Sequence, residues 1–209
     1  MESFCKATGL FEYRRSLILL AGKGGVGKSM IALHIAYAVS NGQRIFDHYA
    51  SEKCKVLIID QENSLSVYKQ RVELLGLDSL DNIDALILQG FRLNDPSHFE
   101  FLEENLNRKG YGLVIMDCWT NLVRGIDENK VGEVADILTK LRRLAYRYDA
   151  TILLVHHLRK NLPYAVEEID ELRGSSVLVN EPDMVYLAYV EKMSGNRIIR
   201  RLKLGMAMK

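Results

Sequence analysis

A short glycine-rich run near the amino terminus has residue types and a spacing that suit phosphate binding. From Gly22 to Ser29 the chain fits G-x-x-x-x-G-K-[ST]. Glycine backbones adopt conformations closed to other residues, so several N–H groups can converge on one anion. Lys28 would lie near the β- and γ-phosphates of ATP, and the Ser29 hydroxyl would help to coordinate Mg²⁺. The residues predicted to contact the nucleotide in this way are Gly22, Lys23, Gly24, Gly25, Val26, Gly27, Lys28, Ser29 and Met30.

Two apolar runs further along the chain end in acidic residues. Residues 55–59 read as a buried strand followed by Asp60-Gln61-Glu62, and residues 112–117 as a strand ending in Asp117. An acid after an apolar strand is often a turn residue or a helix cap. Downstream of a phosphate-binding loop, however, Asp117 matches the Walker B pattern, in which the acid holds Mg²⁺ through its water shell. We therefore predict that Ser29 and Asp117 form the metal site.

A pair of histidines follows another apolar strand, at 151–155. Adjacent residues of a strand point to opposite faces, so His156 and His157 are poorly placed to chelate one metal ion. A polar sensor at the strand edge, hydrogen-bonded to the γ-phosphate or to the attacking water, fits better. The alternative is one histidine packed in the core and one on the surface.

The elements that must position these residues alternate between strands and helices. The predicted strands cover 17–21, 55–59, 85–88, 112–117 and 151–155, and the predicted helices cover 30–39, 65–75, 96–108 and 131–148. This alternation predicts an α/β fold with a mostly parallel twisted sheet and helices on both faces. We expect an N-terminal extension over 1–16 and one domain over 17–209.

The remaining segments are predicted to be loops, apart from the end of the chain. Residues 43–53 form a polar, aromatic insert, which is either a short hairpin near the adenine or simply surface. Residues 118–130 are expected to be a mobile loop, and 158–172 a long polar one. Residues 184–190 and 197–204 predict an antiparallel hairpin. Its second strand is basic, and Lys203 either reaches a nucleotide of a neighbouring subunit or belongs to a charged, solvated edge strand.

Composition narrows the class of protein. The 209 residues include 28 Lys plus Arg and 27 Asp plus Glu, so the net charge of +1 does not by itself demand a nucleic-acid partner. Three widely spaced cysteines suggest neither a disulfide framework nor a zinc site. No run approaches the ~18 apolar residues of a membrane span. We expect a cytoplasmic protein with no membrane contact.

Two known families resemble parts of this sequence. The run from Lys23 to Lys28 resembles the deviant phosphate loop of the ParA and MinD ATPases, in which a lysine at the place of Lys23 reaches across a dimer. The later motifs resemble RecA-fold ATPases of the RepA type, hexameric replicative helicases. The segments that carry this second resemblance are Asp60-Gln61-Glu62, residues 113–117, residues 153–157 and Arg173-Gly174-Ser175-Ser176, within a match over about 17–205.

The RepA-type resemblance implies roles for individual residues. Glu62 takes the place of the catalytic glutamate that orients the attacking water, and His157 takes the sensor position. Arg173 is similar to the arginine that completes the site of an adjacent subunit, and Lys203 is a weaker match to a basic residue near the γ-phosphate. Catalysis is thus expected from Lys28, Glu62, His157 and Arg173.

The resemblances imply three candidate activities. The first is Mg²⁺-dependent ATP hydrolysis in a homo-oligomer, expected to be a hexamer, that acts on single-stranded DNA. The second is a ParA- or MinD-like dimeric switch for positioning cargo. The third is a regulatory ATPase of the RecA fold that acts on a protein partner.

Overall fold

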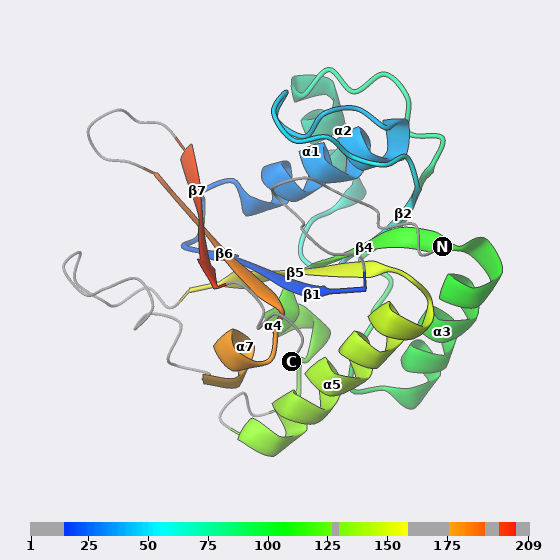
Figure 1. Cartoon of the computed structure of the whole chain (residues 1–209), viewed down its shortest axis with the longest axis vertical. Coiled ribbons are helices and arrows are strands. Elements are labelled where there is room, and N and C mark those ends of the chain that lie inside the picture. The colour runs from blue at the N-terminus through cyan, green and yellow to red at the C-terminus, as the bar shows by residue number, and fades with distance from the viewer. Residues whose placement is uncertain (1–14, 127–129, 159–175, 191–196, 204–209) are drawn as a thin grey trace.

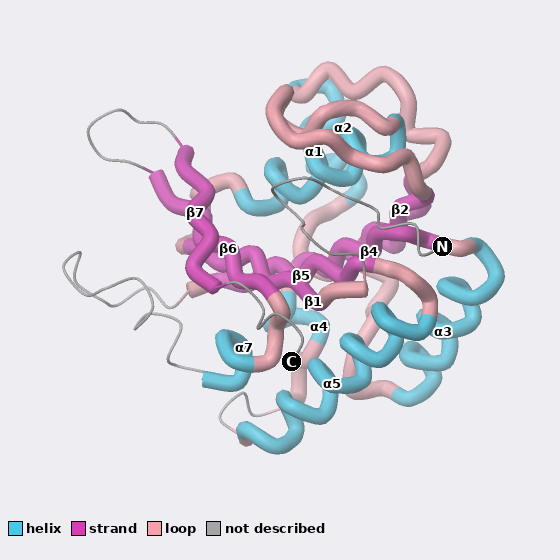
Figure 2. The backbone as a smooth tube through the Cα atoms, in the orientation of Figure 1, coloured by secondary structure: helices cyan, strands magenta, loops and turns pink. Residues whose placement is uncertain are grey.

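The computed structural model describes residues 15–126, 130–158, 176–190 and 197–203. Figure 1 and Figure 2 show their arrangement. The elements in chain order are β1 (Leu17–Gly22), α1 (Lys28–Asn41), β2 (Lys55–Asp60), α2 (Leu65–Leu74), β3 (Ile83–Ile87), α3 (Pro96–Lys109), β4 (Tyr111–Asp117), α4 (Trp119–Leu122), α5 (Val131–Arg147), β5 (Thr151–His157), α7 (Ser176–Asn180), β6 (Met184–Val190) and β7 (Arg197–Lys203).

The described strands form one sheet in the order β3-β2-β4-β5-β1-β6-β7. Every pairing is parallel except that of β6 with β7. The α/β fold with a C-terminal antiparallel hairpin is confirmed, and the predicted elements agree with the observed ones within two residues at each end. Because parallel strands share a direction, the carboxyl ends of β1, β2, β4 and β5 meet at one edge of the sheet.

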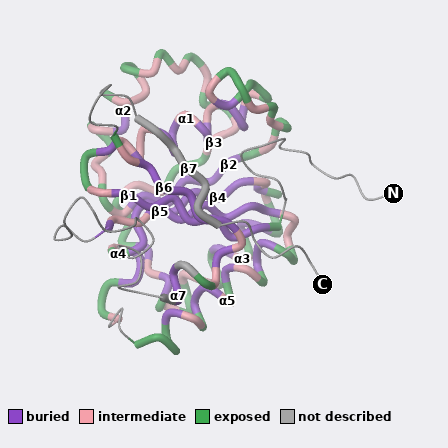
Figure 3. Tube along the Cα trace, turned by 60° about the vertical axis from the view of Figure 1, so that its left-hand side comes forward, coloured by how far each residue is buried: buried purple, intermediate pink, exposed green. Residues whose placement is uncertain are grey.

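Helices cover both faces of the sheet. Helices α1 and α2 lie on one face, and α3, α4, α5 and α7 lie on the other (Figure 1). The side chains of β1 alternate between the two cores: Leu17 and Leu19 pack with α3 and α5, whereas Ile18 and Leu20 pack with α1. The central strands are therefore buried on both sides (Figure 3), which explains why they read as continuous apolar runs.

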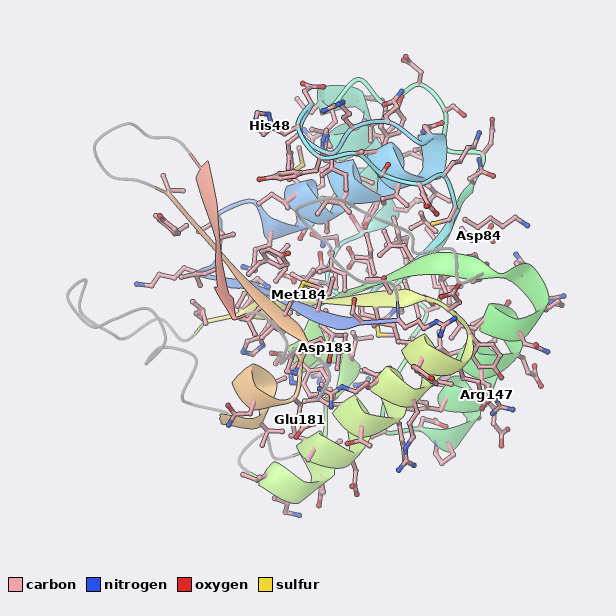
Figure 4. The ribbon with its side chains drawn as sticks, in the orientation of Figure 1. His48, Asp84, Arg147, Glu181, Asp183 and Met184 are labelled. Carbon is pink, nitrogen blue, oxygen red and sulfur yellow. The ribbon has the colours of Figure 1, made fainter. Side chains whose placement is uncertain are left out.

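Polar contacts fix the start of β6 beside β1 and α5. The carboxylate of Asp183 accepts a hydrogen bond from the backbone N–H of Leu17 at 2.8 Å. Arg142 of α5 lies 3.5 Å from both Asp183 and Glu181, and Figure 4 shows these two acids at the connection between α7 and β6. The hairpin is thus anchored at the end of the sheet that lies away from the predicted site.

Two loop predictions need correction or refinement. Residues 118–130 do not begin as a mobile loop, because Trp119 and Leu122 of α4 are fully buried against the α3/α5 core. In the insert at 43–53, buried Ile45 bridges to Tyr49, and Phe46 stacks on His34 of α1 at 4.7 Å. This insert is therefore a tight turn packed on α1. Most of the expected N-terminal extension at 1–16, and most of the polar loop at 158–172, lies outside the described residues.

Among the described residues, no helix combines the length and the apolar character needed to cross a membrane.

Candidate nucleotide-binding site

The glycine-rich loop connects β1 to α1, as the motif predicts. Gly27 caps the helix with φ 93° and ψ 21°, a left-handed conformation that side chains disfavour. Gly22 is required for a different reason. A Cβ atom there would lie 2.4 Å from the carbonyl oxygen of Ala188, so only glycine lets β1 approach β6 at this point.

Lys28 is buried at the first turn of α1, with 3% of its surface exposed. Its Nζ donates to the carbonyl oxygens of Gly22 at 2.8 Å and Lys23 at 2.9 Å, and it lies 3.2 Å from Nδ1 of His157. Three acceptors thus face the three hydrogens of the ammonium group. Burial lowers the pKa of Lys28, and the nearby acids Asp117 and Glu62 oppose that shift.

His157 connects this lysine to Glu62. Its Nε2 lies 2.9 Å from Oε2 of Glu62, while its Nδ1 faces the Lys28 ammonium. Since Nδ1 must accept a hydrogen bond from Lys28, the ring proton is on Nε2, and the Nε2–H group donates a hydrogen bond to the Glu62 carboxylate. This hydrogen bond is the main reason that the pKa of Glu62 is lowered. The structure thus brings together three residues separated widely in the sequence.

Asp117 ends β4 with a buried carboxylate that is 1% exposed. Neither of its oxygens makes a hydrogen bond to a described residue, although the nearby Ser29 hydroxyl acts to lower its pKa. Burial outweighs this effect and raises the pKa to about 6. A buried, unbonded carboxylate next to a hydroxyl fits a divalent cation with oxygen ligands, so the residues present suit the predicted Mg²⁺.

Two residues without a predicted role shape the loop that carries Glu62. Asp60 is fully buried, and its Oδ1 accepts from the backbone N–H groups of Glu62 and Asn63, both at 2.7 Å. Asn121, in α4, donates to the carbonyl oxygen of Gln61 at 3.0 Å. The acid at the end of β2 was visible as a motif residue, but no pattern identified Asn121.

The other predicted residues lie apart from this cluster or outside the described residues. Arg173 falls outside them. Lys203 of β7 pairs with Val185 of β6, and Val185 in turn pairs with Leu19 of β1. Lys203 is therefore level with the middle of β1 and not with Gly22, where the glycine-rich loop begins. His156 follows Val155 on the strand and alternates with His157, so the two histidines lie on opposite faces of the sheet.

The arrangement can bind a triphosphate and activate water. Backbone N–H groups, a lysine, a hydroxyl and a buried carboxylate suit the phosphates and their cation. A half-exposed carboxylate, held by an imidazole, suits the acceptance of a proton from water. Glu62, Asp117 and the glycine-rich loop all lie at the carboxyl edge of the sheet. Phosphate binding and the activation of water can therefore act on one nucleotide.

The chain is similar in sequence to known proteins. The chain is 26% identical over 175 residues to the DNA repair protein RadA of Campylobacter jejuni, covering 80% of this chain and 34% of that protein. It is 25% identical over 206 residues to the RadA of Aquifex aeolicus, covering 97% of this chain and 40% of that protein. The chain therefore spans little more than a third of the length of these relatives.

The solved structure of another protein's ATPase domain has the same fold. It superposes with a TM-score of 0.69 at 15% identity, over 94% of this chain and 80% of that one. The expected fold of the RecA-like P-loop ATPases is thereby confirmed. A family model described as an AAA domain also matches residues 12–162. With its glycine loop, its acid-ended strands and most of its length matched, the chain belongs to this AAA domain family of P-loop ATPases.

Proposed function

We propose that the chain hydrolyses ATP to ADP and phosphate with Mg²⁺, at an interface between copies of itself, and that hydrolysis drives work on DNA. The observation that carries the proposal is the hydrogen-bonded series Lys28–His157–Glu62 beside the buried carboxylate of Asp117. A phosphate ligand and a candidate base are joined through one imidazole. Such a connection suits a site in which nucleotide binding to Lys28 changes the surroundings of Glu62.

Each residue has a defined role in the proposed reaction. Ser29 and Asp117 would hold Mg²⁺, which neutralises charge on the triphosphate when bound. Lys28 would bind the β- and γ-phosphates. Glu62 would orient the attacking water and accept its proton, while His157 holds the Glu62 carboxylate in place.

The site is proposed to be completed by a second copy of the chain. The partner subunit's Arg173 would stabilise negative charge on the transferred phosphate, as an arginine supplied in trans does in other phosphoryl transfers. The partner's Lys203 would add a second positive charge. The register of β7 places the backbone of Lys203 level with the middle of β1, away from the glycine-rich loop of its own chain.

DNA is proposed as the substrate of the motor because the matched relatives are named as DNA repair proteins. Unwinding or translocation of single strands, in replication, recombination or maintenance of a mobile element, would fit that name. The net charge of +1 means that any contact with phosphates is local.

The hydrolytic part of the proposal is tested by ATPase rates and nucleotide binding in matched variants. Lys28→Ala should lose nucleotide binding. Glu62→Gln should bind ATP normally and lose turnover by roughly 10²- to 10⁴-fold, the usual contribution of a positioned base. Glu104→Gln, an exposed acid on α3, removes the same charge away from the site and should behave like the wild type. Normal turnover in Glu62→Gln would exclude that residue as the base.

The assembly is tested by particle mass with a non-hydrolysable ATP analogue, with and without a single-stranded oligonucleotide. A ring that is insensitive to Lys23→Ala supports the proposal. An ATP-dependent dimer that dissociates in Lys23→Ala would instead favour a ParA- or MinD-like switch. An ATPase rate that does not respond to the oligonucleotide would favour a protein partner.

A further inference from the structure

Cys118 completes a cluster of three different ligand types at the edge of the sheet. One ligand atom each from Glu62, Cys118 and His157 lies within 4.8 Å of the others. They come from the loop after β2, the position after β4 and the end of β5. A thiol sulfur, an imidazole nitrogen and a carboxylate oxygen are together the donor set of a thiophilic cation such as Zn²⁺, whereas Mg²⁺ prefers oxygen.

We propose that these three side chains bind a thiophilic divalent cation, with Zn²⁺ as the best match, and that the bound cation blocks hydrolysis. The binding stands on the geometry of the cluster alone. The block rests on the proposed ATPase function, because it requires that Glu62 and His157 take part in turnover.

This site is distinct from the proposed Mg²⁺ site in its ligands. The Mg²⁺ site uses the oxygens of Ser29 and Asp117, and Cys118 is the residue after Asp117. The Cys118 side chain is buried, with the residue 3% exposed, while the side chains of Glu62 and His157 are 36% and 33% exposed. The cluster therefore has one buried ligand and two ligands that are partly open to solvent. Three protein ligands would leave one tetrahedral position open, as in catalytic zinc sites.

Binding would rearrange two protons. As the cation binds Nε2 of His157, the proton now on Nε2 would move to Nδ1, so the imidazole stays neutral with its one proton on Nδ1. The thiol proton of Cys118 would leave to solvent. An Nδ1–H group cannot accept the hydrogen bond that Lys28 makes at 3.2 Å, so cation binding and this position of Lys28 exclude each other.

The proposed block follows from the same ligands. With its oxygen bound to the cation, Glu62 cannot accept a proton from water. His157 likewise cannot hold the Glu62 carboxylate through Nε2. The cation would thus inactivate the enzyme without occupying the phosphate-binding loop.

Binding is tested on the full chain by titration with Co²⁺ alone, in excess Mg²⁺, while following the thiolate-to-cobalt absorption band. Cys118→Ser is the test variant, because a serine hydroxyl is a poor ligand for Co²⁺. Cys54→Ser is the matched control, since Cys54 precedes β2 and its sulfur faces Gly112. We expect one Co²⁺ per chain with the band in the wild type and in Cys54→Ser, and no band in Cys118→Ser. An unchanged band in Cys118→Ser would overturn the site.

Lys28→Ala separates the site from the proposed function. This variant should not bind ATP, yet it removes the group that opposes the Nδ1–H form of His157. It should therefore show the Co²⁺ band at equal or lower Co²⁺ concentration than the wild type. Loss of the band in Lys28→Ala would contradict the proposed ligand arrangement, whether or not the chain proves to be an ATPase.

The block is tested by ATPase rates with Zn²⁺ added to excess Mg²⁺. The wild type and Cys54→Ser should lose turnover at the Zn²⁺ concentration that displaces Co²⁺, and Cys118→Ser should keep it. Turnover that persists in the wild type while Zn²⁺ displaces the Co²⁺ would overturn the inhibitory role.

Discussion

Nζ of Lys28 lies 3.2 Å from Nδ1 of His157, so the lysine of the phosphate-binding loop donates to the same ring that holds Glu62. A γ-phosphate would compete with this ring for the ammonium group. Once Lys28 turned to the phosphate, Nδ1 would lose its donor, and the surroundings of Glu62 would change with it. The nucleotide and the candidate base are in this way coupled through one side chain.

Removing His157 should therefore affect turnover more than binding. In His157→Ala we expect kcat to fall on the order of 10²-fold, the usual effect of losing one positioned polar group, with little change in nucleotide affinity. Steady-state rates and fluorescent-nucleotide titrations measure the two quantities. His48→Ala, an exposed histidine on the 43–53 turn, is the control. An equal kcat in the two variants would leave His157 with no part in the reaction.

The same variant should shift the acid limb of the pH–rate profile. The hydrogen bond from His157 is the main cause of the lowered pKa of Glu62. Without it the Glu62 pKa rises, so the carboxylate is lost at a higher pH as the solution is acidified. The acid limb should move to higher pH in His157→Ala. A limb that stays in place would mean that Glu62 titrates independently of His157.

Asp117 should destabilise the nucleotide-free protein at neutral pH. Its pKa rises from 3.8 to about 6 because of burial, which corresponds to about 3 kcal/mol. The folded state favours the protonated acid, so this penalty is fully present above about pH 6 and disappears as the pH falls toward 3.8. Asp117→Asn should therefore have the larger free energy of unfolding at pH 7.

The difference in the free energy of unfolding between Asp117→Asn and the wild type should become smaller as the pH falls through about 6. Trp119 is the single tryptophan and is fully buried, so its fluorescence reports unfolding by denaturant in both. The comparison cancels other acids, such as Glu62, whose lowered pKa acts in the opposite direction. A difference that does not vary with pH would show that the Asp117 charge is compensated.

The sequence was informative where one physical requirement acts on neighbouring residues. The glycine spacing from 22 to 29 follows from the backbone of one turn, and the apolar run 113–116 follows from burial on both faces of the sheet. Such local requirements leave patterns that a single chain displays. The loop, the strand ends and most of the helices were predictable for this reason.

The sequence was less informative where the requirement joins distant segments. Asn121 contacts Gln61 through one backbone oxygen, and any side chain could occupy position 61 without changing that contact. The three widely spaced cysteines do not suggest a zinc motif, and their spacing along the chain carries no information on the approach of Cys118 to Glu62 and His157. The polar character of residues 118–130 as a whole suggested a loop. The burial of Trp119 depends on distant packing partners in α3 and α5, which the local sequence does not display.

Gly22 and Gly24 should differ in their tolerance of a methyl group. A Cβ at Gly22 would meet the Ala188 carbonyl oxygen at 2.4 Å, whereas one at Gly24 would have no atom within 4 Å. Gly22→Ala should lower the free energy of unfolding by about 1–3 kcal/mol through overpacking. Gly24→Ala should leave the free energy of unfolding nearly unchanged. Equal denaturation midpoints for Gly22→Ala and Gly24→Ala would mean that β1 and β6 can move apart without loss of stability.

Asn121 should act as a positioning residue for Glu62. Its Nδ2 donates to the Gln61 carbonyl at 3.0 Å, and the Gln61 N–H donates to the Asp117 carbonyl at 2.6 Å, so the Glu62 loop is held to the end of β4 and to α4. Asn121→Ala removes one of these ties. We expect a lower kcat with unchanged nucleotide affinity, while Thr120→Ala, on the exposed side of α4, keeps wild-type rates. Asn121→Gln, which retains the amide donor, should recover part of the rate. If both variants at position 121 lost nucleotide binding as well, the amide would serve the fold of the whole site rather than the placement of Glu62.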